Sequence, residues 1–516
     1  MAARASLTIR LFGGAAIAVL LTLSLGTLIA VLLRAEAISG FGRPEWAAVR
    51  FTLMQATLSA LISVSLAIPL ARALARRQFP GRSALITLLG APFILPVIVA
   101  ILGLVAIFGR NGVISNILGF PLDIYGLQGI LLAHVFFNLP LATRLILQGW
   151  LAIPSERFRL AASLGFTSGN VARTIERPML IEIVPGAFLV IFLICLTSFA
   201  VALALGGGPA ATTVELAIYQ AFRFDFDLSK AALLASAQFV ICAIAGIIAL
   251  RLSIPQVAGG ELDRTLDRWD AKSPFLRLQD GVIIILSAVF LLVPLSAVVL
   301  RGLPGVLEMP VSVWQAALRS IFVTVIATTV CMAMSLSLAF FVQNIKRGKI
   351  WVEGVSLLAI AASPLVMGTG LFLILFPMMD PSRAMLFITA LVNAAMALPF
   401  ALRALVPALR QIEGTYGKLA DSLGMHGFTR LRYLYLPRLR RPLGFSAGLI
   451  AALAMGDLGV ITLFSDPNRA TLPLEMYRLM ASYRLEAASG AALLLLMFSL
   501  SVFWIFDKGG RVNADV

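Results

Sequence analysis

Two short stretches of the chain repeat the same small and apolar residues in the same order. Residue types of this kind bind a partner surface without covalent chemistry. Leu-Ala-x-Ser-Leu-Gly occurs at 160–165 and again at 419–424, and a proline follows each glycine by 13 residues, at Pro178 and Pro437. The offset of 259 residues holds well beyond the motif. A register kept over roughly 40 residues indicates an internal duplication.

The chain lacks the residues with which a protein hydrolyses ATP or holds a metal ion. No Gly-x-x-x-x-Gly-Lys-Ser/Thr occurs, and the Gly-Gly-Gly-Pro at 206–209 predicts a tight outer turn because no lysine and hydroxyl follow it. Two histidines far apart predict no His-based metal site. Three cysteines inside apolar runs predict neither a disulfide nor a zinc site. We therefore expect no enzyme activity, metal or cofactor, and energy must come from another subunit.

The composition places these stretches in a membrane protein. Of the 516 residues, 60% are hydrophobic and 13% charged, whereas soluble domains carry about 25% charged residues. Many apolar runs reach the roughly 20 residues that cross a bilayer as a helix. We expect an all-α polytopic protein of about twelve transmembrane helices, six in each half: 11–33, 50–71, 84–108, 127–149, 180–204, 229–251, 279–301, 313–341, 351–376, 384–407, 441–464 and 487–507.

Charge sets the expected orientation. The net charge of +16 does not indicate nucleic-acid binding, because the basic residues flank apolar spans in alternate loops. The loop 72–83 carries four arginines and no acid, and 403–441 carries eight basic residues against two acids. We expect both termini and both repeated stretches on the cytoplasmic side of a bacterial inner membrane. The first apolar run is too long for a signal peptide, so we expect it to be retained.

Each copy of the motif predicts a helix–turn–helix on the cytoplasmic face. Leucine and alanine form a narrow stripe, the glycine turns left-handed, and a second short helix ends at the proline. An alanine in the stripe allows a partner to approach closely. Two amphipathic helices lying on lipid would use similar residues, but no tryptophan anchors them. The predicted docking residues are Leu160, Ala161, Ala162, Leu164, Gly165, Pro178, Leu419, Ala420, Asp421, Leu423, Gly424 and Pro437.

The spacing Ala-x-x-Leu-Gly with a proline 13 residues later resembles the EAA loop of ABC-importer permeases. The resemblance implies a type I permease fold in which each loop is a coupling helix that inserts into a groove of an ATPase. It further implies two copies of a cytoplasmic ABC ATPase, which use ATP and Mg, and a periplasmic substrate-binding protein. One departure is that the family's acidic first position is Arg159 in the first copy and Lys418 in the second.

The stretches 198–220 and 456–484 narrow the resemblance to the fused, two-domain permeases of thiamine and thiamine-pyrophosphate importers, and it covers nearly the whole chain. It implies import of thiamine and its phosphates across the inner membrane. Ferric-iron importers also use fused permeases and are an alternative. An ion-driven secondary transporter is another, and it predicts broken helices or paired acids at the midplane. A membrane enzyme lacks support, since no His, Asp or Glu cluster occurs.

The resemblance also divides the chain. It implies a first transmembrane helix and outer loop at 1–49, a first permease domain at 50–252 and a cytoplasmic linker at 253–278. A seventh helix and outer loop at 279–312, a second permease domain at 313–507 and a cytoplasmic tail at 508–516 follow. Because each half has six spans, the two repeats are expected to be parallel, related by an axis along the membrane normal.

A few polar and aromatic residues are candidates to line the substrate pathway. Asp457 near the end of an apolar run either lines the pathway and attracts a cation or lies at the outer water interface, and both interpretations stay open. Three tyrosines in outer loops could hold a cationic ring by cation–π contact. His134 and Asn138, one helical turn apart, are predicted to hydrogen-bond between helices. The pathway candidates are Ser198, Tyr219, Asp457, Tyr477 and Tyr483.

Overall fold

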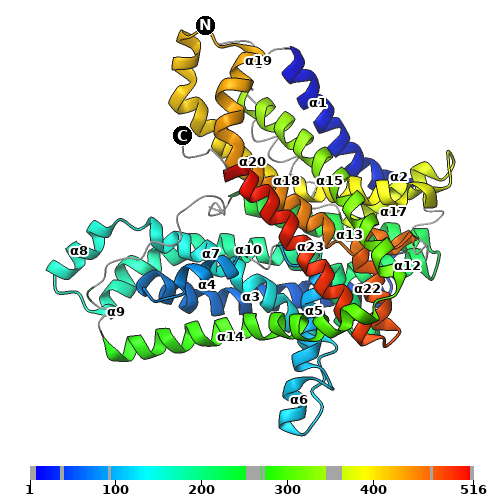
Figure 1. Cartoon of the computed structure of the whole chain (residues 1–516), viewed down its shortest axis with the longest axis horizontal. Helices are drawn as coiled ribbons and strands as arrows, with labels where there is room; N and C mark the ends of the chain where they lie inside the picture. Colours follow the sequence, from blue (N-terminus) through cyan, green and yellow to red (C-terminus); the bar gives the residue numbers. More distant parts are fainter. Residues whose placement is uncertain are drawn as a thin grey trace.

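A computed structural model describes residues 7–34, 40–90, 94–251, 269, 273–344, 363–464 and 469–511, and every regular element in this part is helical. Eleven of its helices are long and apolar enough to cross a membrane, which confirms the all-α membrane fold (Figure 1). The bounds are α1 Leu7–Leu21, α2 Thr27–Arg34, α3 Arg43–Arg76, α4 Arg82–Leu88, α5 Val97–Phe108, α6 Val113–Leu118, α7 Leu127–Ala152, α8 Ser155–Ser163, α9 Ser168–Val171, α10 Arg177–Leu196, α11 Phe199–Leu205, α12 Val214–Arg223, α13 Leu228–Arg251, α14 Pro274–Gly305, α15 Val311–Asn344, α17 Pro364–Leu375, α18 Pro381–Ser422, α19 Gly427–Arg430, α20 Leu436–Met455, α21 Gly459–Phe464, α22 Leu472–Ala481 and α23 Leu485–Arg511.

The duplication is visible in the helices themselves. Four helices of the first half, α9 to α12, recur in the second half as α19 to α22, shifted by 258 to 260 residues at their first residues. In the ninth predicted span, 351–376, the helix α17 is described, while 351–362 lie outside the described residues. Because a lipid-exposed backbone must satisfy its own polar groups, the described parts of the apolar runs are largely helical.

The two halves interlock through their first helices. In the first half, α1 packs on α15 and α2 on α17, both of which belong to the second half. Correspondingly, α14 opens the second half and packs on α3 and α5 of the first (Figure 1). Neither half is therefore an independent bundle, and a movement of one half carries a helix of the other with it.

A buried ion pair fixes one of these crossovers. Asp280 near the start of α14 accepts from Arg76 Nη2 at 2.6 Å and from Arg77 Nε at 2.7 Å, both at the end of α3. The Asp280 side chain is 1% exposed. Since a buried charge is costly unless paired, these two arginines hold α14 against the first half.

Three of the predicted spans are not continuous helices. The run 180–204 is interrupted at Thr197 and Ser198, and the run 441–464 is interrupted at 456–458. In the second break, a methyl group added at Gly456 would lie 2.9 Å from Pro96, so only glycine allows this close approach. The predicted span 84–108 is likewise divided into α4 and α5. Sequence hydropathy missed these interruptions because their flanks are equally apolar.

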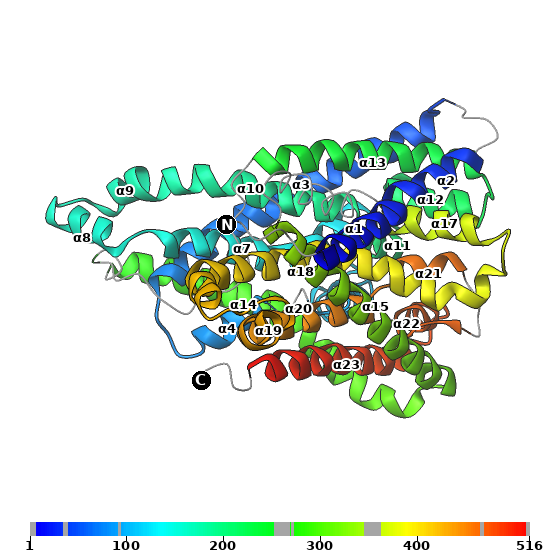
Figure 2. The same cartoon turned by 90° about the horizontal axis from the view of Figure 1, so that it is seen from above.

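The repeated stretches form two hairpins that project from the helix bundle. In Figure 1, α8 and α9 lie at the left and α19 at the top, so the two hairpins project in different directions, while α12, α17 and α22 lie together at the right, away from both. Figure 2 shows the same separation of α8 and α9 from α12, α17, α21 and α22. The hairpins and the short helices after the breaks therefore lie in different parts of the bundle.

Candidate functional site

Both hairpins turn with the same backbone geometry. Gly165 and Gly424 have φ of +66° and +65°, the left-handed conformation predicted from the sequence. In the first hairpin Phe166 N–H donates to the Ala161 carbonyl at 3.0 Å and Gly165 N–H to the Ala162 carbonyl at 3.1 Å. The second hairpin repeats both bonds at 2.9 Å and 3.1 Å. This pair of bonds is a Schellman motif, which closes a helix end and fixes the direction of the chain that follows.

The prolines do not end helices, and that prediction was wrong. Pro178 and Pro437 each lie at the start of a long helix that enters the bundle, α10 and α20. A π-helical turn precedes each of them, at Ala172–Glu176 and Leu431–Tyr435. The wider turn accommodates a residue that has no N–H and whose ring would clash with a carbonyl in a regular helix. The proline 13 residues after the glycine therefore marks a π-helical turn just before a long helix, and not the end of a helix.

The leucines of the motif face outward from each hairpin. Leu160 and Leu164 are 61% and 62% exposed, and Leu419 and Leu423 are 55% and 66% exposed. Ala162, Gly165, Gly424 and both prolines are exposed as well. Apolar side chains so exposed on a projecting hairpin favour a protein partner.

The alanine of the motif has a different role from the one predicted. Ala161 and Ala420 are 3% and 2% exposed and face the inside of their own hairpins. Their small side chains let the two arms of a hairpin approach closely, and they do not offer a surface to a partner. Arg159 and Lys418, which replace the family's acid, are exposed.

The two hairpins differ in how they are packed inside. In the first, Phe158 and Val171 are 1% and 0% exposed and join the hydrophobic core. At the same register, 259 residues later, the second hairpin has Gly417 and Arg430. A methyl group added at Gly417 would lie 3.3 Å from Arg430 Nη2, so the arginine occupies space beside the glycine. An apolar pair has been exchanged for a glycine–arginine pair.

Ion pairs complete the second hairpin. Arg430 Nη2 lies 2.6 Å from Glu413 Oε1, Arg430 Nη1 lies 2.6 Å from Asp421 Oδ1, and Tyr435 Oη donates to Glu413 Oε2 at 2.6 Å. Glu413 occupies the position of Pro154 in the first hairpin, where the proline separates α8 from α7. In the second hairpin α18 instead runs unbroken from Pro381 to Ser422.

The first hairpin is tied to the bundle at its base. Arg72 Nη2 lies 2.8 Å from Glu176 Oε2, and Trp150 Nε1 donates to Glu176 Oε1 at 3.3 Å. The sequence did not predict the ion pairs of either hairpin. The exchange of residues between the two copies at one register was the signal that could have revealed them.

We expect the second hairpin to tolerate the interior residues of the first hairpin only when both positions are replaced together. Gly417→Phe alone should destabilise the second hairpin by about 1–3 kcal/mol, because the ring meets Arg430 and Glu413. Adding Arg430→Val should recover much of that loss, since it recreates the interior of the first hairpin. Amide exchange of the 413–436 segment in the full chain measures the effect, and equal protection in the single and double variants would contradict it.

A further difference lies on the outer faces. Phe428 and Tyr433 are 71% and 65% exposed on the second hairpin. The first hairpin has Gly169 and Thr174 at the same register. The second hairpin therefore offers two aromatic side chains that the first lacks.

The two helix breaks carry matching polar pairs. Ser198 Oγ lies 2.8 Å from His134 Nε2, whose Nδ1 lies 2.9 Å from Ser59 Oγ. At the same register in the second half, Asp457 is hydrogen-bonded by Asn393 and accepts from Gly459 N–H at 3.1 Å. The predicted interhelical bonding of His134 is confirmed, and Asn138 also bonds across helices, to Cys195 Sγ at 3.3 Å. The pathway candidates Ser198 and Asp457 thus lie at equivalent places.

Two of the three tyrosines are brought together. Burial raises the pKa of Tyr219 on α12, and the nearby Arg223 and Arg478 partly oppose this rise. Burial and the neighbouring Tyr219 raise the pKa of Tyr477 on α22, so the two rings lie within electrostatic range of each other. Tyr483 follows α22 and is 89% exposed, with no such tie to this pair.

An unpredicted carboxyl group joins the halves close to these tyrosines in sequence. Glu215 on α12 is fully buried, and Ser363 Oγ at the start of α17 donates to its Oε2 at 2.6 Å. Gln238 Nε2 lies 3.4 Å from its Oε1. Burial raises the pKa of Glu215 to about 8, and the Ser363 bond lowers it in part. Among the described residues, no group of three or more His, Cys, Asp or Glu could hold a metal ion.

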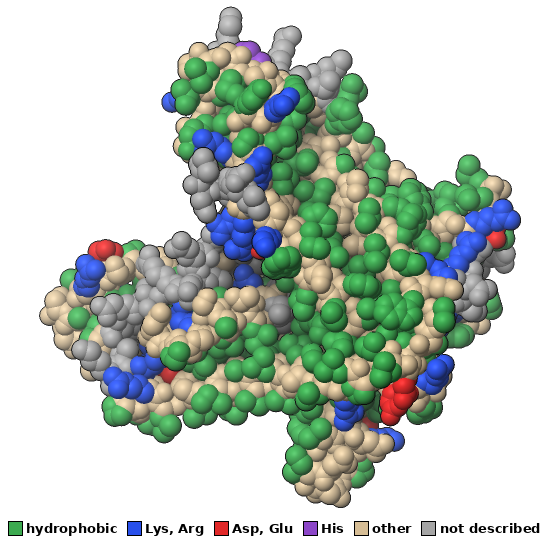
Figure 3. All heavy atoms as spheres, in the orientation of Figure 1, with side chains coloured by type: hydrophobic (Ala, Val, Ile, Leu, Met, Phe, Trp, Pro, Cys, Tyr) green, Lys and Arg blue, Asp and Glu red, His purple; other side chains and the backbone are tan. Residues whose placement is uncertain are grey.

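An apolar bundle of two interlocked helical repeats, from which two matched hairpins project, defines a multi-pass membrane protein. Figure 3 shows the broadly hydrophobic face of such a protein. No family model matches the chain. It is 39% identical over 520 residues to the thiamine transport system permease protein ThiP of Brucella abortus (strain 2308), covering 98% of this chain and 96% of that protein.

The relative of the same description in Escherichia coli (strain K12) is 40% identical over 488 residues, covering 91% of this chain and 90% of that protein. A shorter match, 31% over 144 residues, is to the sulfate transport system permease protein CysW of Synechococcus elongatus, covering 27% of this chain and 50% of that protein. The chain belongs to the family of thiamine transport system permease proteins.

Proposed function

We propose that the chain is the permease subunit of an ATP-driven importer of thiamine and its phosphates. Two copies of a cytoplasmic ABC ATPase bind the two hairpins, and a periplasmic binding protein delivers the substrate at the opposite end. Both termini lie in the cytoplasm. ATP and Mg are used by the ATPase and not by this chain.

The observation that carries the coupling role is the pair of hairpins with one backbone geometry. In both, a Schellman motif closes the first helix and two leucines are exposed, and Figure 1 shows both hairpins away from α12 and α22. A pair of equivalent sites suits two copies of one partner. The 39% identity over almost the whole chain to thiamine permeases supports the substrate.

We place the substrate pathway along the helix breaks. Ser198 and Asp457 lie at equivalent interruptions, where freed backbone and side-chain groups offer hydrogen bonds. Thiamine carries a permanent positive charge on its thiazolium ring, and the carboxyl group of Asp457 is suited to attract it. Tyr219 and Tyr477 offer ring faces to the same cation nearer the delivery end.

The test is ATP hydrolysis by the full chain reconstituted with its ATPase and binding protein. Thiamine, its phosphates and ferric iron are added separately, with the binding protein omitted as the control. We expect thiamine or its phosphates to stimulate hydrolysis and ferric iron to have no effect. Stimulation by ferric iron alone would contradict the substrate, and failure of the ATPase to associate with the chain would contradict the coupling role.

A further inference from the structure

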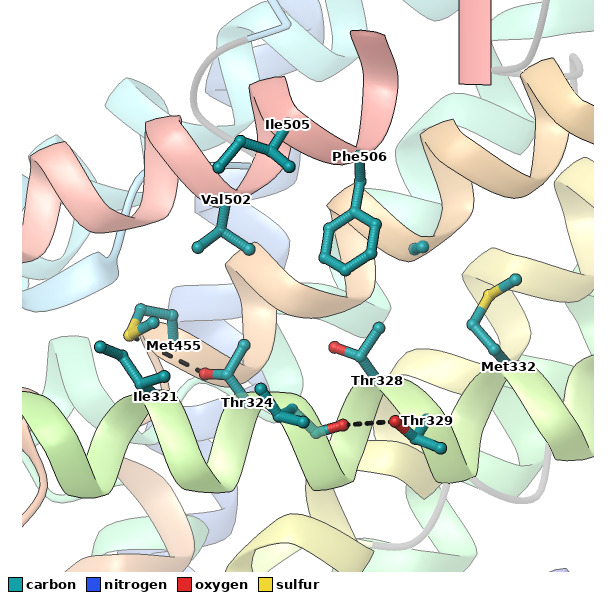
Figure 4. A pocket seen from close by; sticks show the side chains of 11 residues that line it. Ile321, Thr324, Thr328, Thr329, Met332, Met455, Val502, Ile505 and Phe506 are labelled. Carbon is teal, nitrogen blue, oxygen red and sulfur yellow. Dashed lines mark hydrogen bonds between the residues drawn. The ribbon is translucent and has the colours of Figure 1, made fainter. Parts of the chain in front are cut away.

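A groove lies on the outer face of the second half, between α15, α20 and α23. Its volume is about 380 Å³, and its walls are apolar apart from three threonines on α15. Figure 4 shows Val502 and Phe506 pointing from α23 towards α15, with Thr324 and Thr328 pointing back and Ile505 lying along α23. Val325 and Ile505 are both 59% exposed, so the groove opens to the outside of the helix bundle. All three helices belong to the second half, so the groove is not the passage between the halves.

The length of the groove along α15 is close to the thickness of the hydrocarbon layer of one bilayer leaflet. On α15 it extends from Ile321 to Met332, a rise of about 16 Å along the helix. Half of the hydrocarbon core of a bilayer is about 15 Å thick. An extended hydrocarbon chain from a single leaflet is therefore an occupant of the right length and polarity.

Two exposed cationic residues follow the groove towards the end of α23, one on α23 and one on α20. Lys508 follows the lining residue Ile505 by one helical turn, and its Nζ lies 4.5 Å from the ring centre of Trp504. A methyl group added at Gly510 would lie 2.7 Å from the Arg440 carbonyl oxygen, so α20 and α23 nearly touch at this level. Arg440 and Lys508 are both exposed there. A tryptophan beside a lysine is typical of the level of the lipid headgroups.

We propose that the groove binds one acyl chain of an anionic phospholipid whose phosphate is held by Lys508 and Arg440. The acyl chain lies along α15 beneath Phe506 and Ile505. A net anionic headgroup is favoured over a zwitterionic one, because each nearby cation attracts its charge. The bound lipid stabilises the packing of α23 against α15 and α20, on the side of the bundle from which the second hairpin projects.

The test uses the full chain purified from nanodiscs of equal phosphatidylglycerol and phosphatidylethanolamine. Native mass spectrometry measures which lipid stays bound. One variant, Lys508→Gln with Arg440→Gln, removes the charges, and another, Val325→Trp, fills the groove. The matched controls are Arg110→Gln, an exposed arginine far from the groove in sequence, and Val289→Trp, an exposed valine on α14.

We expect retained phosphatidylglycerol to exceed phosphatidylethanolamine by about tenfold in the unmodified chain and in both controls. Both groove variants should lose that preference while eluting as intact protein. Equal retention of the two lipids by the unmodified chain, or a preference that survives either groove variant, would overturn the proposal. Because the two variants act on different parts of the lipid, a folding defect in one leaves the other as a test.

Discussion

Replacing Gly165 and Gly424 together by valine should reduce ATP-driven uptake at least about 100-fold while the chain still inserts in the membrane. Both glycines have φ near +65°, where a β-branched residue is strongly disfavoured, at roughly 1–2 kcal/mol or more for each position. Nothing lies within 4 Å of a methyl group added at either one, so the cost is in the backbone alone. The hairpins would unwind their Schellman turns and misplace the exposed leucines.

The matched control is the double asparagine variant. Asparagine tolerates the left-handed conformation, so Gly165→Asn with Gly424→Asn should keep most uptake. Uptake of labelled thiamine is compared with the amount of each variant in the membrane. If the valine and asparagine pairs transport equally well, the turn geometry does not matter for coupling.

Removing the aromatic side chains of the second hairpin should have the next largest effect. Phe428→Gly with Tyr433→Thr gives that hairpin the residues of the first at the same register. Exposed aromatic anchors at an interface commonly contribute about 2 kcal/mol or more each, so ATPase binding should weaken at least about 100-fold. We expect the second hairpin to hold its ATPase subunit more tightly than the first.

Two comparisons isolate this effect. Phe120→Gly removes an exposed phenylalanine outside both hairpins and should leave ATPase binding unchanged. The reverse exchange, Gly169→Phe with Thr174→Tyr, should strengthen binding at the first hairpin. Titration of the solubilised permease with ATPase measures all four proteins, and an unchanged affinity in the Phe428 and Tyr433 variant would refute the unequal docking.

The features that follow directly from the repeated motif and from the apolar runs could be predicted from the sequence. The left-handed glycines followed from the recurrence of Leu-Ala-x-Ser-Leu-Gly, and the membrane fold from the apolar runs. The direction in which each motif residue faces was harder to predict. Alanine suits both a tight internal contact and a partner surface, and only the structure shows Ala161 and Ala420 facing inward. Proline at 178 and 437 suits either a helix end or a helix start after a π turn.

Other features depend on contacts between distant segments, which hydropathy does not report. At the break at 456–458, Pro96 from the other half lies against Gly456, a contact that no property of the run 441–464 predicts. The ion pair of Asp280 with Arg76 and Arg77 joins residues more than 200 positions apart. The exchange of Phe158 and Val171 for Gly417 and Arg430 was nevertheless readable, because the 259-residue register aligns them.

The central claim is that ATP hydrolysis, acting through the two hairpins, drives thiamine through this chain. The most direct test is accumulation of labelled thiamine in proteoliposomes that contain the chain and its ATPase, with binding protein on the delivery side. We predict accumulation against a gradient with ATP, none with a non-hydrolysable analogue, and none in the double valine variant. Accumulation driven by a proton or sodium gradient in the absence of ATP would contradict the account.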